Sequence, residues 1–128
     1  IGYNYRMPNI NAALGCARLE NLDRYVADKR ETAACYAEFF KGKEDITFFT
    51  EPADCKSNYW LNAVVLKDKA AQLDFLEYTN DHGVMTRPVW ELMNRLPMFE
   101  HCETDGLENT EWLADRVVNI PSSVRLDK

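Results

Sequence analysis

The first residues of the chain carry side chains that suit an anion. Asn4 offers a neutral amide donor, and Arg6 offers a planar guanidinium that matches phosphate oxygens. Pro8 favours the first turn of a helix, where backbone N–H groups and the helix dipole attract negative charge. One interpretation is therefore a phosphate-binding segment. The other is an ordinary helix start whose aromatic residues, Tyr3 and Tyr5, pack on a neighbouring element.

Other reactive side chains are too sparse to form a site. His101 adjoins Cys102, but no second pair stands at metal-ligand spacing, and zinc requires four ligands. We therefore expect no metal. His82 precedes Gly83 at the expected end of a helix, where a capping role is the simplest one. No arrangement of Ser, His and Asp resembles a hydrolase centre.

The composition excludes two classes of partner. The formal charge is −6, and the basic residues are not clustered, so we expect no nucleic-acid surface. The apolar stretches fall well short of the roughly 20 residues that span a bilayer, so we expect no membrane span. The four cysteines form no C-x-x-C pair, and we expect free, buried or half-buried thiols in a reducing cytoplasm. They are Cys16, Cys35, Cys55 and Cys102.

The elements that must position these residues follow from periodicity. Apolar residues recur at steps of three and four over residues 8–41 and predict one long amphipathic helix. Runs of β-branched and aromatic residues predict strands, and apolar–polar periodicity with suitable stops predicts further helices. The expected strands are 46–49, 59–66, 84–87 (ended by Pro88) and 117–120, and the expected helices are 70–82, 90–95 and 107–116. Trp60 and Trp112 stand in apolar contexts that favour the core.

This order of elements predicts an α+β fold. A long amphipathic helix leads into a small antiparallel or mixed sheet with helices on one face. We divide the chain into an interface segment with its linking helix, residues 1–41, and a small α/β domain, residues 42–128. The start at Ile1 lacks an initiator Met and a signal core, which favours an internal segment of a longer protein.

The opening sequence GYNYRMPNINAALGCARLENLD resembles a motif of the DegT/DnrJ/EryC1/StrS aminotransferases, G-x-N-x-R-M-x-x-x-x-A-A-x-G-x-x-Q-L. Arg18 stands where the family usually has Gln, a change on the helix surface. YWLNAVVL, GVMTRPVWELMNRLPMF and VVNIPSS extend the resemblance over nearly the whole chain. The last two are most similar to members that act on UDP-linked 4-keto amino sugars, on the way to bacillosamine or legionaminic acid.

The resemblance implies a pyridoxal-phosphate enzyme that moves an amino group, usually from glutamate, to a nucleotide-linked keto sugar. Similar enzymes are homodimers in which the Asn of the motif reaches the cofactor phosphate of the partner subunit, and Asn4 takes that position here. Arg6 would meet substrate phosphates or hold the segment, and Tyr5 would flank the nucleotide sugar. Arg87 would bind diphosphate or sugar oxygens and Trp90 would line the pocket; the alternatives are an Arg paired with a surface carboxylate and a Trp in the core.

The resemblance also locates what this chain lacks. The catalytic lysine of similar enzymes precedes the segment at which the chain begins, so we expect no catalytic residue here and no activity from the isolated chain. A dehydratase of the same family, with His in place of that lysine, is one alternative. The other is a stand-alone binding or interaction module, which requires a complete domain with a sealed core.

Overall fold

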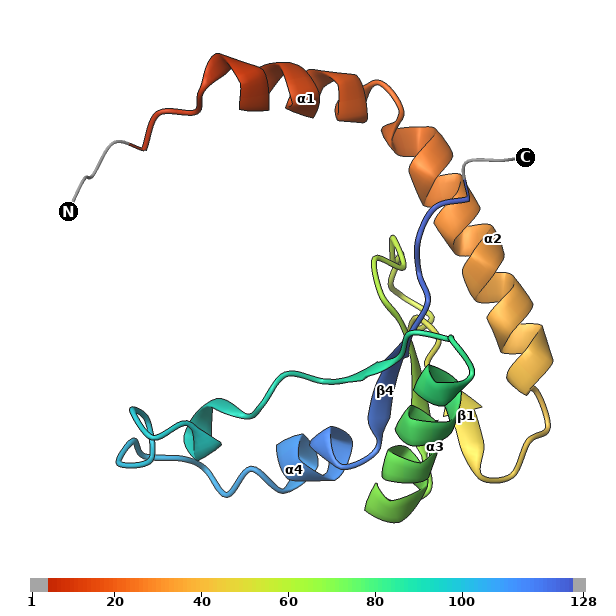
Figure 1. The fold of residues 1–128 in the computed structure, drawn as a ribbon, viewed down its shortest axis with the longest axis vertical. Coiled ribbons are helices and arrows are strands. Elements are labelled where there is room, and N and C mark those ends of the chain that lie inside the picture. Colours follow the sequence, from red (N-terminus) through yellow and green to blue (C-terminus); the bar gives the residue numbers. More distant parts are fainter. Residues whose placement is uncertain (1–4, 126–128) are drawn as a thin grey trace.

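The computed structural model describes residues 5–125, which form four α-helices, one 3-10 turn and four strands (Figure 1). In chain order these are α1 (Asn9–Leu19), α2 (Leu22–Phe40), β1 (Ile46–Phe48), β2 (Asn62–Leu66), α3 (Lys69–Asp81), β3 (Arg87–Pro88), the 3-10 turn Met93–Arg95, α4 (Glu108–Ala114) and β4 (Val117–Ile120). The α+β class expected from the sequence is confirmed.

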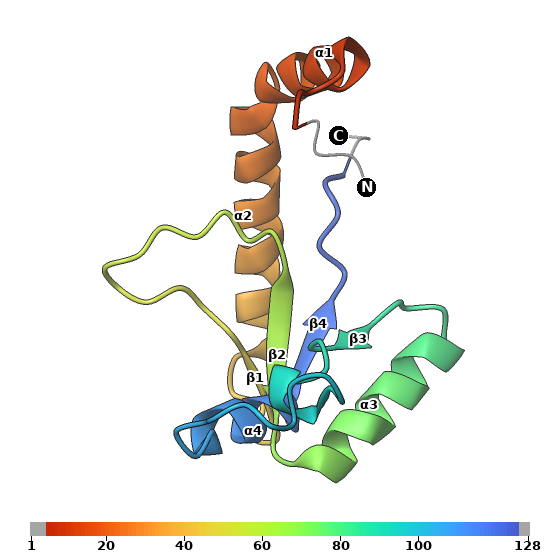
Figure 2. The same ribbon diagram turned by 90° about the vertical axis from the view of Figure 1, so that its left-hand side faces the viewer.

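The four strands form one sheet in the order β1-β2-β4-β3, and each neighbouring pair is antiparallel (Figure 2). Asn62 of β2 stands opposite Ile120 of β4, and Arg87 of β3 stands opposite Asn119. This register brings the residues before β2, the residues after β4 and the start of β3 to the same end of the sheet. That end carries the groove described below.

The core lies on one face of this sheet. Side chains alternate along β2 and β4, so that Val64, Leu66, Val118 and Ile120 are buried together. Phe48 of β1 and Ala33 of α2 complete the cluster, and three residues of α3 pack against it: Ala71, Phe75 and Leu76. Both helices therefore cover the same face, as the sequence predicted.

The long helix expected over residues 8–41 is two helices whose axes diverge (Figure 1). The break falls at Asn21, whose backbone N–H donates to Arg18 O at 3.2 Å rather than to the carbonyl four residues back. The Asn21 side chain takes over that carbonyl, donating from Nδ2 to Ala17 O at 3.0 Å. An asparagine that competes with the backbone in this way ends a helix while the apolar periodicity runs on.

Two strands differ from their expected bounds for local reasons. β2 begins at Asn62 rather than Tyr59, because Tyr59 has a φ of 46° and leaves the extended conformation. β3 spans only Arg87–Pro88: residues 84–86, expected to belong to the strand, lie outside it, and Pro88, expected to end it, is included. Since β3 is at the edge of the sheet, Pro88 can pair with Val118 there without an N–H of its own.

The remaining elements are close to expectation, apart from one helix. Residues 90–95 form only the short 3-10 turn, while α3 and α4 each lie within about two residues of their expected bounds. His82 is the C-cap of α3, its Nδ1 lies 2.7 Å from Tyr78 O, and Gly83 follows with a φ of 77°. The capping role expected for His82 is therefore confirmed.

Several residues expected inside lie at the surface. Trp60 and Trp112 are 66% and 50% exposed, so the prediction that they are core residues is wrong. Trp60 precedes β2 in a loop, and Trp112 lies on α4 with the Arg116 guanidinium carbon 4.6 Å from its ring centroid; neither belongs to the core cluster. All four cysteines are free, as expected, but exposed rather than buried. No helix within residues 5–125 is long and apolar enough to cross a membrane.

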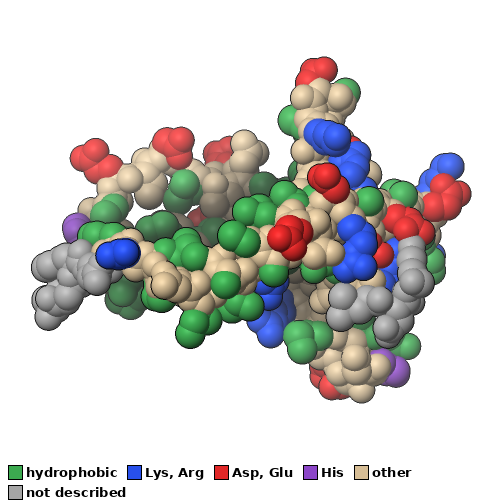
Figure 3. Space-filling view, turned by 90° about the horizontal axis from the view of Figure 1, so that it is seen from above, with side chains coloured by type: hydrophobic (Ala, Val, Ile, Leu, Met, Phe, Trp, Pro, Cys, Tyr) green, Lys and Arg blue, Asp and Glu red, His purple; other side chains and the backbone are tan. Residues whose placement is uncertain are grey.

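Helix α1 buries none of its residues. Its apolar side chains, including Ile10, Leu14 and Leu19, are exposed, and hydrophobic groups lie along the helix in Figure 3. We expect the isolated chain to self-associate, because a contiguous apolar surface is a typical association site. Sedimentation velocity checks this, with Leu14→Glu expected to shift the chain toward monomer. A clean monomer at high concentration for the unaltered chain contradicts the prediction.

Candidate functional site

A groove of about 810 Å³ lies at the end of the sheet where β2 begins and β4 ends. We call it the Arg87 groove; its lining residues are Lys29, Trp60, Leu61, Met85, Arg87, Pro88, Val89, Trp90, Asn119, Ile120, Pro121, Ser122 and Ser123. Four segments that are distant in sequence meet here. The structure thus brings together two of the residues singled out in the sequence, Arg87 and Trp90.

Arg87 presents its guanidinium to this groove from the edge strand β3. Its hydrogen-bond partner is the Met85 sulfur, 3.5 Å from Nη2, and thioether sulfur is a weak acceptor. No carboxylate within residues 5–125 forms an ion pair with Arg87, so the surface-pair alternative does not apply there. The guanidinium is available to an anionic ligand.

Two indoles line the same groove. Trp90 is 73% exposed, which excludes the alternative that it is a core residue, and Trp60 reaches the groove from the loop before β2. Exposed indole faces suit stacking against a flat ring or the apolar face of a sugar. Sequence reasoning missed Trp60. Its place in the expected strand over residues 59–66 favoured the core, and no other signal in the sequence pointed to the groove.

The Ser122 wall of the groove is built by hydrogen bonds. Ser122 Oγ accepts from the Asn62 backbone N–H at 2.7 Å and donates to Ile120 O at 2.8 Å. The Lys29 ammonium donates to two carbonyls, Trp60 O at 3.3 Å and Ser122 O. Lys29 and Ser122 were not among the site residues chosen from the sequence, although Ser122 lies within the VVNIPSS segment.

A second network lies behind the Trp60 loop. Arg30 pairs with both oxygens of Glu51, at 2.6 and 3.0 Å, and donates to Ser57 O at 2.6 Å. Glu51 also accepts the Ser57 backbone N–H. These hydrogen bonds, led by that from Arg30, lower the pKa of Glu51 from 4.5 to about 2.

This lowered pKa predicts a pH-dependent stability. A carboxylate with a depressed folded-state pKa stabilises the fold above its ordinary pKa and loses that effect as pH falls through the folded value. Glu51→Gln should therefore be less stable than the unaltered chain at pH 6, and the difference should shrink between pH 4.5 and about 2. Urea unfolding midpoints measure it. Glu38→Gln, which removes an exposed ion pair with Lys41, is the control expected to have little effect; a pH-independent gap for Glu51→Gln contradicts the prediction.

The remaining sequence candidates lie elsewhere. Asn4 falls outside the described residues. Tyr5 is 92% exposed, and neither Tyr5 nor Arg6 lines the Arg87 groove. Both precede α1, which extends away from the sheet in Figure 1. A joint site for these residues and the groove is therefore not present within this single chain's described part.

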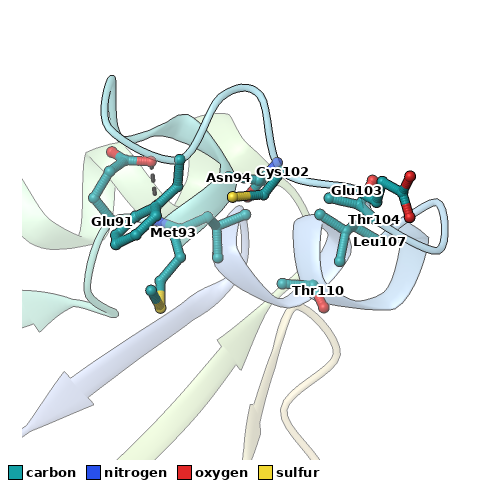
Figure 4. A pocket seen from close by; sticks show the side chains of 10 residues that line it. Glu91, Met93, Asn94, Cys102, Glu103, Thr104, Leu107 and Thr110 are labelled. Atoms are coloured by element: carbon teal, nitrogen blue, oxygen red, sulfur yellow. Dashed lines mark hydrogen bonds between the residues drawn. The ribbon is translucent and has the colours of Figure 1, made fainter.

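A smaller, mainly apolar pocket of about 470 Å³ lies between residues 91–104 and the start of α4 (Figure 4). The thiol of Cys102 lines it, and the hydrogen bond drawn there runs from the Leu92 N–H to Glu91 Oε1 at 3.1 Å. No base among residues 5–125 is hydrogen-bonded to that thiol. Within the same residues no three His, Cys, Asp or Glu side chains are grouped to hold a metal ion.

The fold of this chain is similar to part of solved sugar aminotransferases. CalS13 from Micromonospora echinospora superposes with a TM-score of 0.82 at 26% identity, over 99% of this chain and 33% of that one. Helicobacter pylori PseC has the same fold, with a TM-score of 0.88 at 21% identity, over 99% of this chain and 35% of that one.

The chain belongs to the DegT/DnrJ/EryC1/StrS aminotransferase family, whose profile matches residues 1–128. The GDP-perosamine synthase of Escherichia coli O157:H7 is 31% identical over 124 residues, which are 95% of this chain and 33% of that protein. The GDP-perosamine synthase of Vibrio cholerae is 28% identical over 125 residues, 95% of this chain and 34% of that protein. The chain spans about a third of the length of these relatives.

The family depends on pyridoxal phosphate, which supplies an electron sink for amino transfer when it is bound. The described residues that fit its phosphate are at the start of α1. Arg6 carries the cationic donor, and the N–H groups of Asn9, Ile10 and Asn11 precede the first intrahelical bond, which runs from Ala12 N to Pro8 O.

Proposed function

We propose that this chain forms the substrate-binding wall of a pyridoxal-phosphate enzyme that transfers an amino group, from glutamate, to a keto sugar carried on a nucleotide. The observation that supports this proposal is the meeting of Arg87, Trp90 and Trp60 in one open groove. A nucleotide sugar offers a diphosphate for a guanidinium and rings for indoles, so the residue types in the groove match the ligand class.

Each residue has a distinct role in this proposal. Arg87 binds diphosphate oxygens, and Trp60 and Trp90 hold the base or the sugar ring from two sides of the groove. Asn4 reaches the cofactor phosphate of the partner subunit in a homodimer, with Arg6 beside it and Tyr5 flanking the nucleotide sugar. The chemistry itself requires a lysine that we expect to precede this chain.

The exposure of helix α1 favours a part of a larger enzyme over a stand-alone module. A module needs a sealed core, whereas α1 is a helix of 11 residues with none of them buried. In the intact enzyme that helix would be covered by the rest of the protein or by the partner subunit. The dehydratase alternative shares this feature; the E. coli GDP-4-keto-6-deoxy-D-mannose-3-dehydratase has the same fold, with a TM-score of 0.78 at 20% identity.

The test uses the full-length protein with pyridoxal phosphate, glutamate and 4-keto sugars linked to GDP, UDP or dTDP. All three nucleotides are needed, because the sequence resembles members that use UDP, while three relatives are GDP-perosamine synthases and another is a dTDP-sugar transaminase. We expect 2-oxoglutarate and an amino sugar in equal amounts, measured by mass spectrometry. A deoxygenated sugar without nitrogen would indicate the dehydratase instead, and no turnover with any nucleotide would contradict the proposal.

A further inference from the structure

Two neighbouring residues of α2 hold the loop that carries Trp60. Lys29 donates to Trp60 O at one end of the segment 57–60, and Arg30 donates to Ser57 O at the other. Glu51 closes the second contact by binding the Arg30 guanidinium through both oxygens and the Ser57 N–H through one. The segment is thus tied to the helix at both ends.

The segment depends on these ties because it has little support of its own. It precedes β2 and makes no ladder bonds, and its N–H groups at Tyr59 and Trp60 bond only to nearby side chains, Ser57 Oγ at 2.9 Å and Asn58 Oδ1 at 3.0 Å. Tyr59 also has a φ of 46°, which is unfavourable for a bulky residue. A conformation of this kind persists when its surroundings fix it.

The contacts from Arg30 extend to the ring of Tyr59. The guanidinium carbon lies 5.6 Å from the ring centroid, and the Tyr59 hydroxyl accepts the Glu51 N–H at 3.2 Å. Tyr59 also stacks on Phe48 of the core, with ring centroids 6.5 Å apart. The Tyr59 side chain is therefore turned toward the core and the ion pair, while the next residue, Trp60, is left exposed to the groove.

Helix α2 holds the opposite wall of the Arg87 groove as well. The same Lys29 ammonium donates to Ser122 O. About two helical turns further along α2, the Tyr36 hydroxyl donates to Pro121 O at 3.1 Å. One cation therefore bridges the Trp60 side and the Ser122 side. This bridge adds to the hydrogen bond from the Asn62 N–H to Ser122 Oγ, and it is the link that reaches Trp60 itself.

We propose that Lys29, assisted by the Arg30–Glu51 pair, is a positioning residue that sets the width of the Arg87 groove by fixing Trp60 relative to Ser122. The inference rests on the proposed function, since it concerns the groove that would take the nucleotide sugar. Lys29 acts through the two carbonyls rather than by touching the reacting atoms. Its removal should move Trp60 without unfolding the sheet.

Fluorine NMR of the full-length protein, labelled with 5-fluorotryptophan, tests this directly. The Trp60 resonance is assigned by its loss in Trp60→Phe. We expect Lys29→Met to shift or split that resonance, Lys29→Arg to restore most of its position, and Lys41→Met, which removes an exposed ion pair at the other end of α2, to leave it unchanged. Should Lys29→Met fail to fold, Glu51→Gln serves as the second variant and should also shift the signal. A Trp60 resonance unmoved in the folded variants overturns the inference.

Calorimetric titration with GDP and with UDP tests whether Lys29 affects nucleotide binding. We expect Lys29→Met to bind the preferred nucleotide about tenfold more weakly than the wild type, with Lys29→Arg between them and Lys41→Met equal to the wild type. Equal affinity in Lys29→Met overturns the inference even if the resonance moves. If the wild-type protein binds neither nucleotide, the proposed substrate class fails, while the fluorine spectra still decide whether Lys29 positions Trp60.

Discussion

Replacing Arg87 by methionine in the full-length protein is expected to raise KM for the nucleotide sugar about ten- to a hundred-fold. A hydrogen bond to a charged partner contributes about 1.5 to 3 kcal/mol, and each 1.4 kcal/mol is a factor of ten. The guanidinium is open to a ligand, since its partner among the described residues is the weak Met85 sulfur. Steady-state kinetics with varied nucleotide sugar measures the change.

Whether the substitution changes KM or kcat tests the role of Arg87, in addition to the size of the change. Diphosphate oxygens lie away from the reacting carbon, so Arg87 should bind ground state and transition state alike, raising KM while kcat changes little. Arg87→Lys should recover part of the binding, because an ammonium keeps the charge but not the planar fork. Arg95→Met removes an exposed pair with Glu91 and is the matched control. An unchanged KM in Arg87→Met would show that Arg87 does not bind the substrate.

Strand β4 could be predicted because its residues carry the information locally. Three of its four residues, Val117, Val118 and Ile120, are β-branched, and the structure gives β4 the expected bounds 117–120. The break between α1 and α2 could not be predicted in the same way. Apolar periodicity continues across Asn21, and what ends the helix is one side chain taking the Ala17 carbonyl from the backbone, a competition that a single asparagine wins in some helices and loses in others.

The candidate site also contains residues that could be predicted from the sequence and one that could not. Arg87 and Trp90 were found because a family motif carries them. Trp60 was assigned to the core because it stands in an apolar context within the strand expected over residues 59–66. Its exposure depends on Tyr59 turning inward at a positive φ, which depends in turn on Arg30 and Glu51. These contacts join residues far apart in sequence, and only the folded arrangement of α2 beside the loop before β2 brings them together.

The second large effect on activity is expected from substitutions in the segment before α1. If Asn4 reaches the partner's cofactor, each site in a homodimer takes its lysine from one subunit and Asn4 from the other. An Asn4→Ala protein should lose activity corresponding to about 1 to 3 kcal/mol, the contribution of one hydrogen bond to a charged phosphate. A variant lacking the catalytic lysine should lose essentially all of it.

Co-expression of these two variants then separates a trans from a cis placement. In a mixed dimer with the trans arrangement, one site has both functional residues and the other has neither, because a two-fold interface makes each contact twice. Half of a statistical mixture is mixed dimer and half of its sites are intact, so activity should return to about a quarter of wild type on that symmetry. Tagging the two subunits differently isolates the mixed species and measures its activity per dimer. If the isolated mixed dimers are no more active than the average of the two parent variants, Asn4 acts within its own subunit. In that case the exposed residues of α1 would pack on something other than the partner's active site.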